Sequence, residues 1–211
     1  MDMRHILVEA GKKLINEGFT IETWGNISLR DDDGIVYITP SGVDYETCTV
    51  DDIIVMTQEK EILFGNRAPS IETDLHLAVY EARPDVKAIV HTHPVHSMVF
   101  ACMGESIPLM LDEAAQVLGA EVMTAPYALP GSIELAKNCV TALGDKANAC
   151  LLQSHGAVCI GSDIKKAFKV AKVLETTAEI YGKIRAIGGK YIPISDENIE
   201  KMRQYGKLNL S

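Results

Sequence analysis

The segment KAIVHTHPVH, residues 87–96, joins an apolar run to three of the chain's six histidines and constrains the fold more than any other stretch. The apolar run predicts a buried strand, and Pro94 predicts its end because proline cannot donate to a β-ladder. Side chains alternate between the faces of a strand, so we expect His91 and His93 to point the same way, with Thr92 opposite. Two imidazoles that project together from a strand end are either metal ligands or a hydrogen-bonded structural pair.

A third histidine, His155, lies in LLQSHGAVCI between two strand-like runs, followed by a glycine that permits a tight turn. An ionisable side chain buried there needs a partner, so His155 is either a satisfied structural histidine or a third ligand. Three histidines with an open coordination position form the catalytic type of zinc site. Together with His91 and His93, this residue predicts a metal centre that suits Zn²⁺, with Mn²⁺ or Co²⁺ as alternatives.

A carboxylate, Glu72, lies at the start of a helix expected over residues 71–83 with Ser70 as its N-cap. It would either complement the helix dipole or lie beside the metal as a base or displaceable ligand. His76, one turn later, and His96, after the proline, are alternative ligands, although packing or support of the ligands suits both better.

Two turn-forming loops and a helix start predict an anion site that needs no lysine or arginine. TWGNISLR places Asn26 just before a strand, and ITPSGVDY places Ser41 and Gly42 just after one. Backbone amides and hydroxyls in such turns bind anions, as does a helix N-terminus such as the one at Ser70. Each loop alone is an ordinary turn, but the combination predicts a phosphate site.

The remaining periodicities predict one domain over residues 1–211 with intermixed helices and strands, hence an α/β fold with helices covering a central sheet. Helices are expected at about residues 3–17, 71–83, 96–103, 131–144 and 164–187 and after Ser195. Strands are expected at about 26–30, 35–39, 52–56, 61–64, 88–93, 120–126, 148–153 and 157–161.

Composition argues against several kinds of partner. The net charge of −9 argues against an electrostatic nucleic-acid binder or a membrane-surface protein. No stretch approaches the roughly 18 apolar residues of a membrane span, and residues 1–19 lack the apolar core of a signal peptide. The five cysteines are scattered without a C-x-x-C pair, so we expect reduced thiols in a cytoplasmic protein.

The motifs GNIS, ITPSG, PSIE…H, VHTHPVH and LLQSHG, in this order and spacing, resemble the class II aldolase and adducin family. The resemblance covers nearly the whole chain, including YG near the C-terminus. It implies a single domain with a central, mainly antiparallel β-sheet flanked by α-helices. It further implies a homotetramer with active sites at subunit interfaces, and a zinc-dependent aldehyde-lyase acting on a small phosphorylated sugar.

Carried over residue by residue, the resemblance implies a metal set, an acid/base and a phosphate set. The metal ligands would be His91, His93, His155 and Glu72, with Glu72 also the acid/base. The phosphate ligands would be Asn26, Ser41, Gly42 and Ser70. The motifs are most similar to those of bacterial enzymes that cleave L-fuculose 1-phosphate, which implies cleavage of a ketose 1-phosphate to dihydroxyacetone phosphate and a short aldehyde through a metal-stabilised enediolate.

Three departures from the fuculose-phosphate pattern concern the substrate rather than the metal. A second serine before the glutamate is Ile71 here, which removes one hydroxyl from the phosphate site. A tyrosine and a phenylalanine near the aldehyde end correspond to Asp112 and Pro130, whereas a C-terminal tyrosine is retained as Tyr205. We expect Asp112 to handle protons from a neighbouring subunit, unless it is a solvated surface carboxylate, and Tyr205 to be a further catalytic group.

Other reactions of the same superfamily stay open. A pentulose-phosphate 4-epimerase uses the same cleavage and re-adds the aldehyde on its other face, and a sugar-phosphate dehydratase or decarboxylase also needs a metal-stabilised enolate. Asp112 and Glu113 could serve such proton transfers. A non-enzymatic interaction module, as in adducin, is the alternative of a different class, and the intact H-x-H, S-H-G and Glu72 argue against it.

Overall fold

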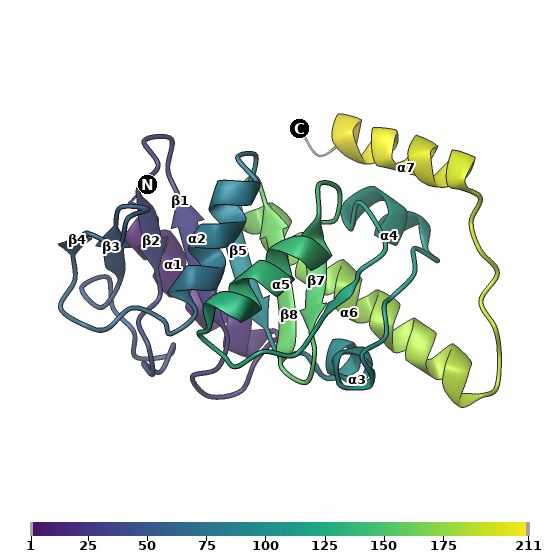
Figure 1. The fold of residues 1–211 in the computed structure, drawn as a ribbon, viewed down its shortest axis with the longest axis horizontal. Helices are drawn as coiled ribbons and strands as arrows, with labels where there is room; N and C mark the ends of the chain where they lie inside the picture. The colour runs from purple at the N-terminus through teal and green to yellow at the C-terminus, as the bar shows by residue number, and fades with distance from the viewer. Residues whose placement is uncertain (1, 210–211) are drawn as a thin grey trace.

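The computed structural model describes residues 2–209, in which helices and strands are intermixed along the chain (Figure 1). The helices are α1 (Met3–Asn16), α2 (Thr73–Ala82), α3 (Val95–Met103), α4 (Asp112–Val117), α5 (Ile133–Leu143), α6 (Ile164–Ala186) and α7 (Asp196–Asn209). The strands are β1 (Asn26–Arg30), β2 (Val36–Ile38), β3 (Ile54–Met56), β4 (Ile62–Phe64), β5 (Ala88–Thr92), β6 (Thr124–Ala125), β7 (Ala149–Leu152) and β8 (Gly156–Gly161).

The strands form a single sheet in the order β4-β3-β2-β1-β5-β8-β7-β6. Neighbouring strands are antiparallel except β6 and β7, which are parallel. The predicted fold, a mainly antiparallel sheet flanked by helices in one α/β domain, is therefore confirmed. Strand β5, which carries the histidine motif, lies at the centre between β1 and β8.

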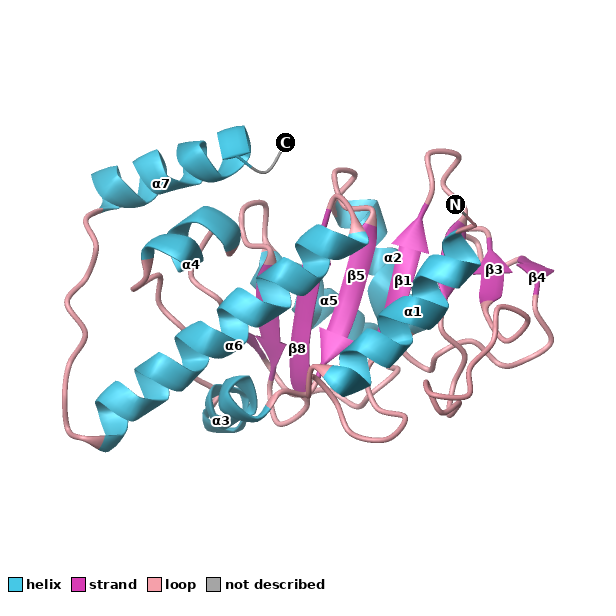
Figure 2. Ribbon diagram, turned by 180° about the vertical axis from the view of Figure 1, so that it is seen from behind, coloured by secondary structure: helices cyan, strands magenta, loops and turns pink. Residues whose placement is uncertain are grey.

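Helices cover both faces of the sheet, so the protein has two apolar cores. Helices α1 and α6 lie over one face (Figure 2), where Leu14 and Phe168 are buried. Helices α2 and α5 lie over the other face (Figure 1), where Leu75 and Leu135 are buried. Because both of its faces are covered, β5 is buried along its whole length. This explains why its sequence reads as a continuous apolar run instead of an alternating pattern.

The ends of several elements agree with the sequence, whereas the start of α2 does not. Ser132 caps α5, near the start of the helix expected at about 131–144, its Oγ accepting the N–H of Leu135 at 3.1 Å. The expected α2 start with Ser70 as N-cap is wrong, because Glu72 takes the N-cap position and makes no side-chain capping bond. Ser70 instead forms a turn ahead of the helix, its carbonyl accepting the N–H of Thr73 at 3.1 Å.

Two further differences concern the segment after the histidine strand. Residues 112–117 form the short helix α4, for which the sequence offered no clear periodicity. The strand expected over 120–126 is reduced to the two residues of β6. Within residues 2–209, no helix has the length and apolar character needed to cross a bilayer.

Candidate metal centre

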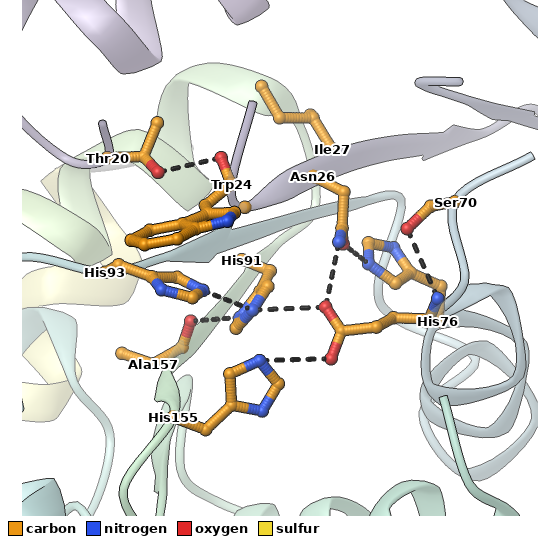
Figure 3. Close-up of polar contacts among 12 residues, drawn as sticks. Thr20, Trp24, Asn26, Ile27, Ser70, His76, His91, His93, His155 and Ala157 are labelled. Carbon is orange, nitrogen blue, oxygen red and sulfur yellow. Dashed lines mark hydrogen bonds and ion pairs between the residues drawn. The ribbon is translucent and has the colours of Figure 1, made fainter. Parts of the chain in front are cut away.

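Strand β5 delivers two histidines to one end of the sheet (Figure 3). His91 pairs with Asn26 of β1 on one side and with Val158 of β8 on the other. His93 follows the strand immediately before Pro94, which is the N-cap of α3. The centroids of the two imidazole rings are 4.7 Å apart, so the side chains share a face as strand alternation predicts.

His155 reaches the same place from the tight turn between β7 and β8. Its ring centroid lies 4.9 Å from that of His91 and 5.3 Å from that of His93. The turn depends on Ser154, which adopts a left-handed φ of 56°, and on Gly156, where a Cβ would lie 2.9 Å from Cε1 of His91. One nitrogen of each histidine faces the others, and these three atoms lie within 4.8 Å of one another.

A hydrogen bond orients His91, and burial keeps His93 and His155 in the neutral form that metal binding requires. Nδ1 of His91 lies 3.0 Å from the carbonyl oxygen of Ala157. A carbonyl can only accept, so Nδ1 carries a proton, and Nε2 is the nitrogen that faces the cluster. Burial lowers the pKa of His93 to about 3 and the pKa of His155 to about 4, so both are unprotonated at neutral pH.

Glu72 joins the cluster from the N-terminus of α2. Its Oε2 lies 3.1 Å from Nε2 of His91 and accepts the Nδ2–H of Asn26 at 2.9 Å, and its Oε1 lies 3.3 Å from Nε2 of His155. Burial raises the pKa of the Glu72 carboxyl, but its interactions with His91 and His155, which attract it when they are protonated, and the Asn26 hydrogen bond outweigh burial and lower the pKa overall. The group is therefore a carboxylate.

The donor set fits a divalent transition metal. Imidazole nitrogens and a carboxylate oxygen are the ligands found in catalytic zinc sites, and Mn²⁺ or Co²⁺ also accept them. Oε1 of Glu72 is buried and has no hydrogen-bond donor, as expected for an oxygen that coordinates a cation when one is bound. The residues that would hold the ion are His91, His93 and His155, with Glu72 beside them.

The two alternative histidine ligands lie outside this cluster. His76 is fully buried on α2, with Nε2 2.5 Å from Oδ1 of Asn26. It therefore supports Asn26, which in turn contacts Glu72. His96 is on α3, where its backbone N–H donates to Glu175 at 2.8 Å.

The metal cluster opens into a cleft of about 540 Å³. The predicted phosphate ligands all line it: Asn26, Ser41, Gly42 and Ser70. Backbone hydrogen bonds hold their loops together, since the N–H of Ser41 donates to the Ala68 carbonyl at 3.0 Å and that of Ser70 to the Thr39 carbonyl at 3.2 Å. The fold thus brings the predicted metal and phosphate residues into one cleft.

Comparison with known proteins identifies the family to which the chain belongs. The chain matches the class II aldolase and adducin N-terminal domain over residues 5–182. It belongs to the class II aldolase and adducin family. It is 36% identical over 208 residues to 5-deoxy-D-ribulose 1-phosphate aldolase of Bacillus thuringiensis serovar kurstaki, covering 97% of both chains. It is 33% identical over 204 residues to L-fuculose phosphate aldolase of Escherichia coli K12, covering 95% of this chain and 94% of the relative.

A solved structure supports the same assignment. The fold matches an L-fuculose 1-phosphate aldolase with a TM-score of 0.93 and 34% sequence identity, covering 98% of this chain and 96% of the other. The match extends over nearly the full length of both chains. The resemblance inferred from the five motifs is therefore confirmed.

In this class II aldolase family member, two predicted catalytic residues do not line the cleft. Asp112 begins α4 and Tyr205 lies on α7, and both are exposed. The two helices pack together toward the end of the sheet where β5 begins, away from the histidines at the end of β5 (Figures 1 and 2). Neither residue can therefore act in the cleft of its own chain without a large rearrangement.

Other residues of the cleft had no assigned role in the sequence. Trp24 lies over His93, with ring centroids 6.2 Å apart and planes 28° from parallel (Figure 3). Met98 and Ser154 line the cleft as well. The position of Trp24 in the sequence could have indicated such a role, because it is the chain's only tryptophan and directly precedes the Gly25–Asn26 turn.

Proposed function

We propose that this family member cleaves a ketose 1-phosphate reversibly to dihydroxyacetone phosphate and a short aldehyde. One observation carries the proposal: the histidine cluster and Glu72 share a cleft with the small-residue loops around Ser41 and Ser70. Cleavage of the bond between carbons 3 and 4 places negative charge two atoms from a phosphorylated carbon. A cation site next to a phosphate site matches that charge distribution.

The phosphate would be held by hydrogen bonds rather than by cations. No lysine or arginine lines the described cleft, whereas the hydroxyls of Ser41 and Ser70, the backbone at Gly42 and the remaining N–H of Asn26 do. Ser41 and Gly42 are exposed in the cleft and free to meet a ligand. Ile71 takes the place of a further hydroxyl, so each remaining donor matters more for binding.

The proposed ion is Zn²⁺, with Mn²⁺ or Co²⁺ as alternatives. When bound, it supplies Lewis-acid stabilisation of the negative charge that develops as the carbon–carbon bond breaks. Glu72 is the proposed acid/base: in the cleavage direction the hydroxyl on carbon 4 gives up its proton as the C3–C4 bond breaks, and Glu72 passes a proton to carbon 3 of the enediolate, so that no net proton is gained or lost. In the synthetic direction Glu72 removes the proton from carbon 3. A carboxylate is a weak base, so Glu72 would act only on a proton whose acidity a cation held by the histidine cluster would raise.

The proposed substrates are methyl-terminated ketose 1-phosphates. Two relatives are named for 5-deoxyribulose 1-phosphate and for fuculose phosphate, which would release acetaldehyde and lactaldehyde respectively. Both aldehydes end in a methyl group. Trp24, Ile71, Met98 and Pro130 give the cleft an apolar wall that suits such an end.

A homotetramer with active sites at subunit interfaces is part of the proposal. Asp112 and Tyr205 lie away from the cleft of their own chain, so a role in catalysis would require a neighbouring chain. Exposed apolar side chains on α3, namely Val95, Val99 and Met103, are available for such contacts. A cytoplasmic location is also proposed, supported by five cysteines that are all unpaired thiols.

The test is a screen of the zinc-loaded protein with dihydroxyacetone phosphate and a panel of short aldehydes, run beside ketopentose phosphates and sugar acid phosphates. We expect carbon–carbon bond formation with acetaldehyde or lactaldehyde, detected by mass spectrometry of the product. Interconversion of two ketopentose phosphates would instead identify a 4-epimerase, and release of water or CO₂ a dehydratase or decarboxylase. Absence of turnover on every phosphorylated substrate would exclude the proposal.

A further inference from the structure

A chain of buried hydrogen bonds leads from Glu72 into the interior of the sheet. Oε2 of Glu72 accepts from Nδ2 of Asn26 at 2.9 Å, and Oδ1 of Asn26 lies 2.5 Å from Nε2 of His76 (Figure 3). Nδ1 of His76 lies 2.6 Å from Oγ of Ser28, which lies 2.8 Å from the hydroxyl of Tyr80. The five side chains come from β1 and α2 and are all at most 6% exposed.

The donor and the acceptor of every hydrogen bond in this network can be assigned by starting from the Glu72 carboxylate. The Glu72 carboxylate can only accept, so Asn26 turns its NH₂ toward it and its carbonyl oxygen toward His76. That oxygen also only accepts, so His76 carries its proton on Nε2. Nδ1 of His76 then has a free lone pair and accepts the hydroxyl proton of Ser28, and Oγ of Ser28 accepts the hydroxyl proton of Tyr80. Each hydrogen-bonding proton of the network is therefore assigned to one atom.

The pKa shifts of the His76 ring and the Tyr80 phenol agree with this order of donors and acceptors. Burial lowers the pKa of His76 to about 3, so the ring is neutral and has one N–H to place. Burial raises the pKa of Tyr80, so its hydroxyl keeps the proton that it donates. The bonds therefore run in one direction, from Tyr80 toward Glu72, and aligned bonds of this kind strengthen one another.

We infer that His76 is a positioning residue that holds the Glu72 carboxylate, through Asn26, in the orientation needed for proton transfer. Glu72 has three rotatable bonds, and as the N-cap of α2 it makes no side-chain capping bond. Asn26 is its sole hydrogen-bond donor among described residues outside the histidine cluster, and His76 fixes the rotation of the Asn26 amide. Oε2 is thereby held, and Oε1 remains without a donor.

A merely structural role would not explain this arrangement. Burying four polar side chains behind the carboxylate is less favourable than filling the same space with apolar residues, unless the polar network has another use. His76 and Ser28 are 0% exposed, so they touch neither solvent nor the cleft. Only Asn26 and Glu72, at one end of the network, line the cleft, and Glu72 is the carboxylate proposed to move the proton. The inference rests on that proposed role.

A matched pair of substitutions separates positioning from packing. His76→Gln keeps an amide N–H near the place of Nε2 and can still donate to Asn26, whereas His76→Asn reaches only the place of Nδ1. We expect His76→Gln to stay within about threefold of the wild-type kcat and His76→Asn to lose about tenfold or more. KM should rise less than about fivefold in both, because Ser41, Gly42 and Ser70 still hold the phosphate when the Asn26 amide is released. Zinc content should stay at one ion per chain in both. His5→Asn on the exposed face of α1 is the control and should change nothing.

Tyr80→Phe provides a second variant if either substitution at His76 prevents folding. It removes the hydroxyl at the far end of the network and keeps the aromatic ring, so we expect kcat to fall about two- to fivefold at unchanged KM and zinc content. Equal kcat values in wild type and Tyr80→Phe, or in the two folded variants of His76, would overturn the inference.

A spectroscopic measurement needs no activity. In ¹⁵N spectra of the metal-free protein, His76 should be the Nε2–H tautomer and should not titrate between pH 8 and 5. The Nδ1–H tautomer would reverse the order of the bonds and overturn the inference.

The proposed function is tested separately by exchange of dihydroxyacetone phosphate protons with D₂O. If the wild type exchanges none, the proposed function fails and the positioning role fails with it; if the wild type exchanges and the two His76 variants do so equally, only the positioning role fails.

Discussion

Nε2 of His91 lies 3.1 Å from Oε2 of Glu72, although one residue comes from the end of a central strand and the other from the start of a helix. The contact exists because α2 packs on the face of the sheet toward which His91 projects. It joins a metal ligand to the proposed acid/base within one buried cluster. Base and metal should therefore act as a unit, and removing either should abolish the reaction without unfolding the protein.

Glu72→Gln tests the base. The variant keeps the size of the side chain and its place at α2 but cannot accept a proton. We expect it to remain folded, to retain most of its zinc, and to lose on the order of 10²-fold or more in kcat. It should also fail to exchange the hydroxymethyl proton of dihydroxyacetone phosphate with D₂O, as followed by NMR. Exchange at the wild-type rate would assign the base to another residue; Glu59→Gln, on the exposed surface, is the matched control.

The metal centre predicts about one divalent ion per chain, measured by elemental analysis of the purified protein. Chelation should abolish activity and added Zn²⁺ should restore it, while circular dichroism shows that the metal-free chain keeps its fold. His93→Asn should lose the ion. His96→Asn should keep it, since His96 lies outside the cluster on α3. Full activity in a protein free of divalent ions would contradict the assignment.

Ser41→Ala tests the phosphate site. The residue is exposed at the cleft, so its hydroxyl is available to the ligand and its loss should not disturb the core. We expect KM for the phosphorylated substrate to rise by an amount equivalent to about 1 kcal/mol, roughly fivefold, with kcat little changed. Ser162→Ala, which does not line this cleft, should leave KM unchanged. Equal reactivity of unphosphorylated ketoses would argue against any phosphate site.

Asp112→Asn tests the contribution of a neighbouring chain. If Asp112 handles a proton in the cleft of another subunit, the variant should lower kcat and leave the zinc content unchanged. Co-expressing Asp112→Asn with Glu72→Gln chains should then recover part of the activity, because some interfaces in the mixed tetramer pair an intact Glu72 with an intact Asp112. A wild-type rate for Asp112→Asn would make it an ordinary surface carboxylate.

Acid should destabilise the metal-free protein through its buried neutral histidines. Burial lowers the pKa of His76 to about 3, from an ordinary value near 6.5. Below pH 6.5 the unfolded chain binds a proton at this site and the folded chain does not, so the free energy of unfolding falls as pH drops from about 6.5 toward 3. The slope is about 1.4 kcal/mol per pH unit for a fully buried group. Urea unfolding between pH 7 and 4.5 should show a shallower slope for His76→Gln and an unchanged slope for His5→Gln; parallel curves for all three proteins would contradict this assignment.

Local sequence was sufficient to predict which residues could meet a metal. Strand alternation places His91 and His93 on one face, and proline ends the strand directly after them. Gly156 predicts the tight turn that presents His155. These are properties of neighbouring residues, so they can be read before the fold is known.

Only the tertiary structure decided which side chains contact these residues and which predicted residues lie in the cleft. Asn26 was expected at a phosphate, and its amide also joins Glu72 to His76, a contact between β1 and α2 that no local pattern encodes. The start of α2 moved to Thr73 because a turn formed by Ser70 precedes it. Asp112 and Tyr205 lie far from the cleft because α4 and α7 pack together at the other end of the sheet. Long-range packing sets these positions, since it depends on which helix covers which face of the sheet and not on the residues beside each motif.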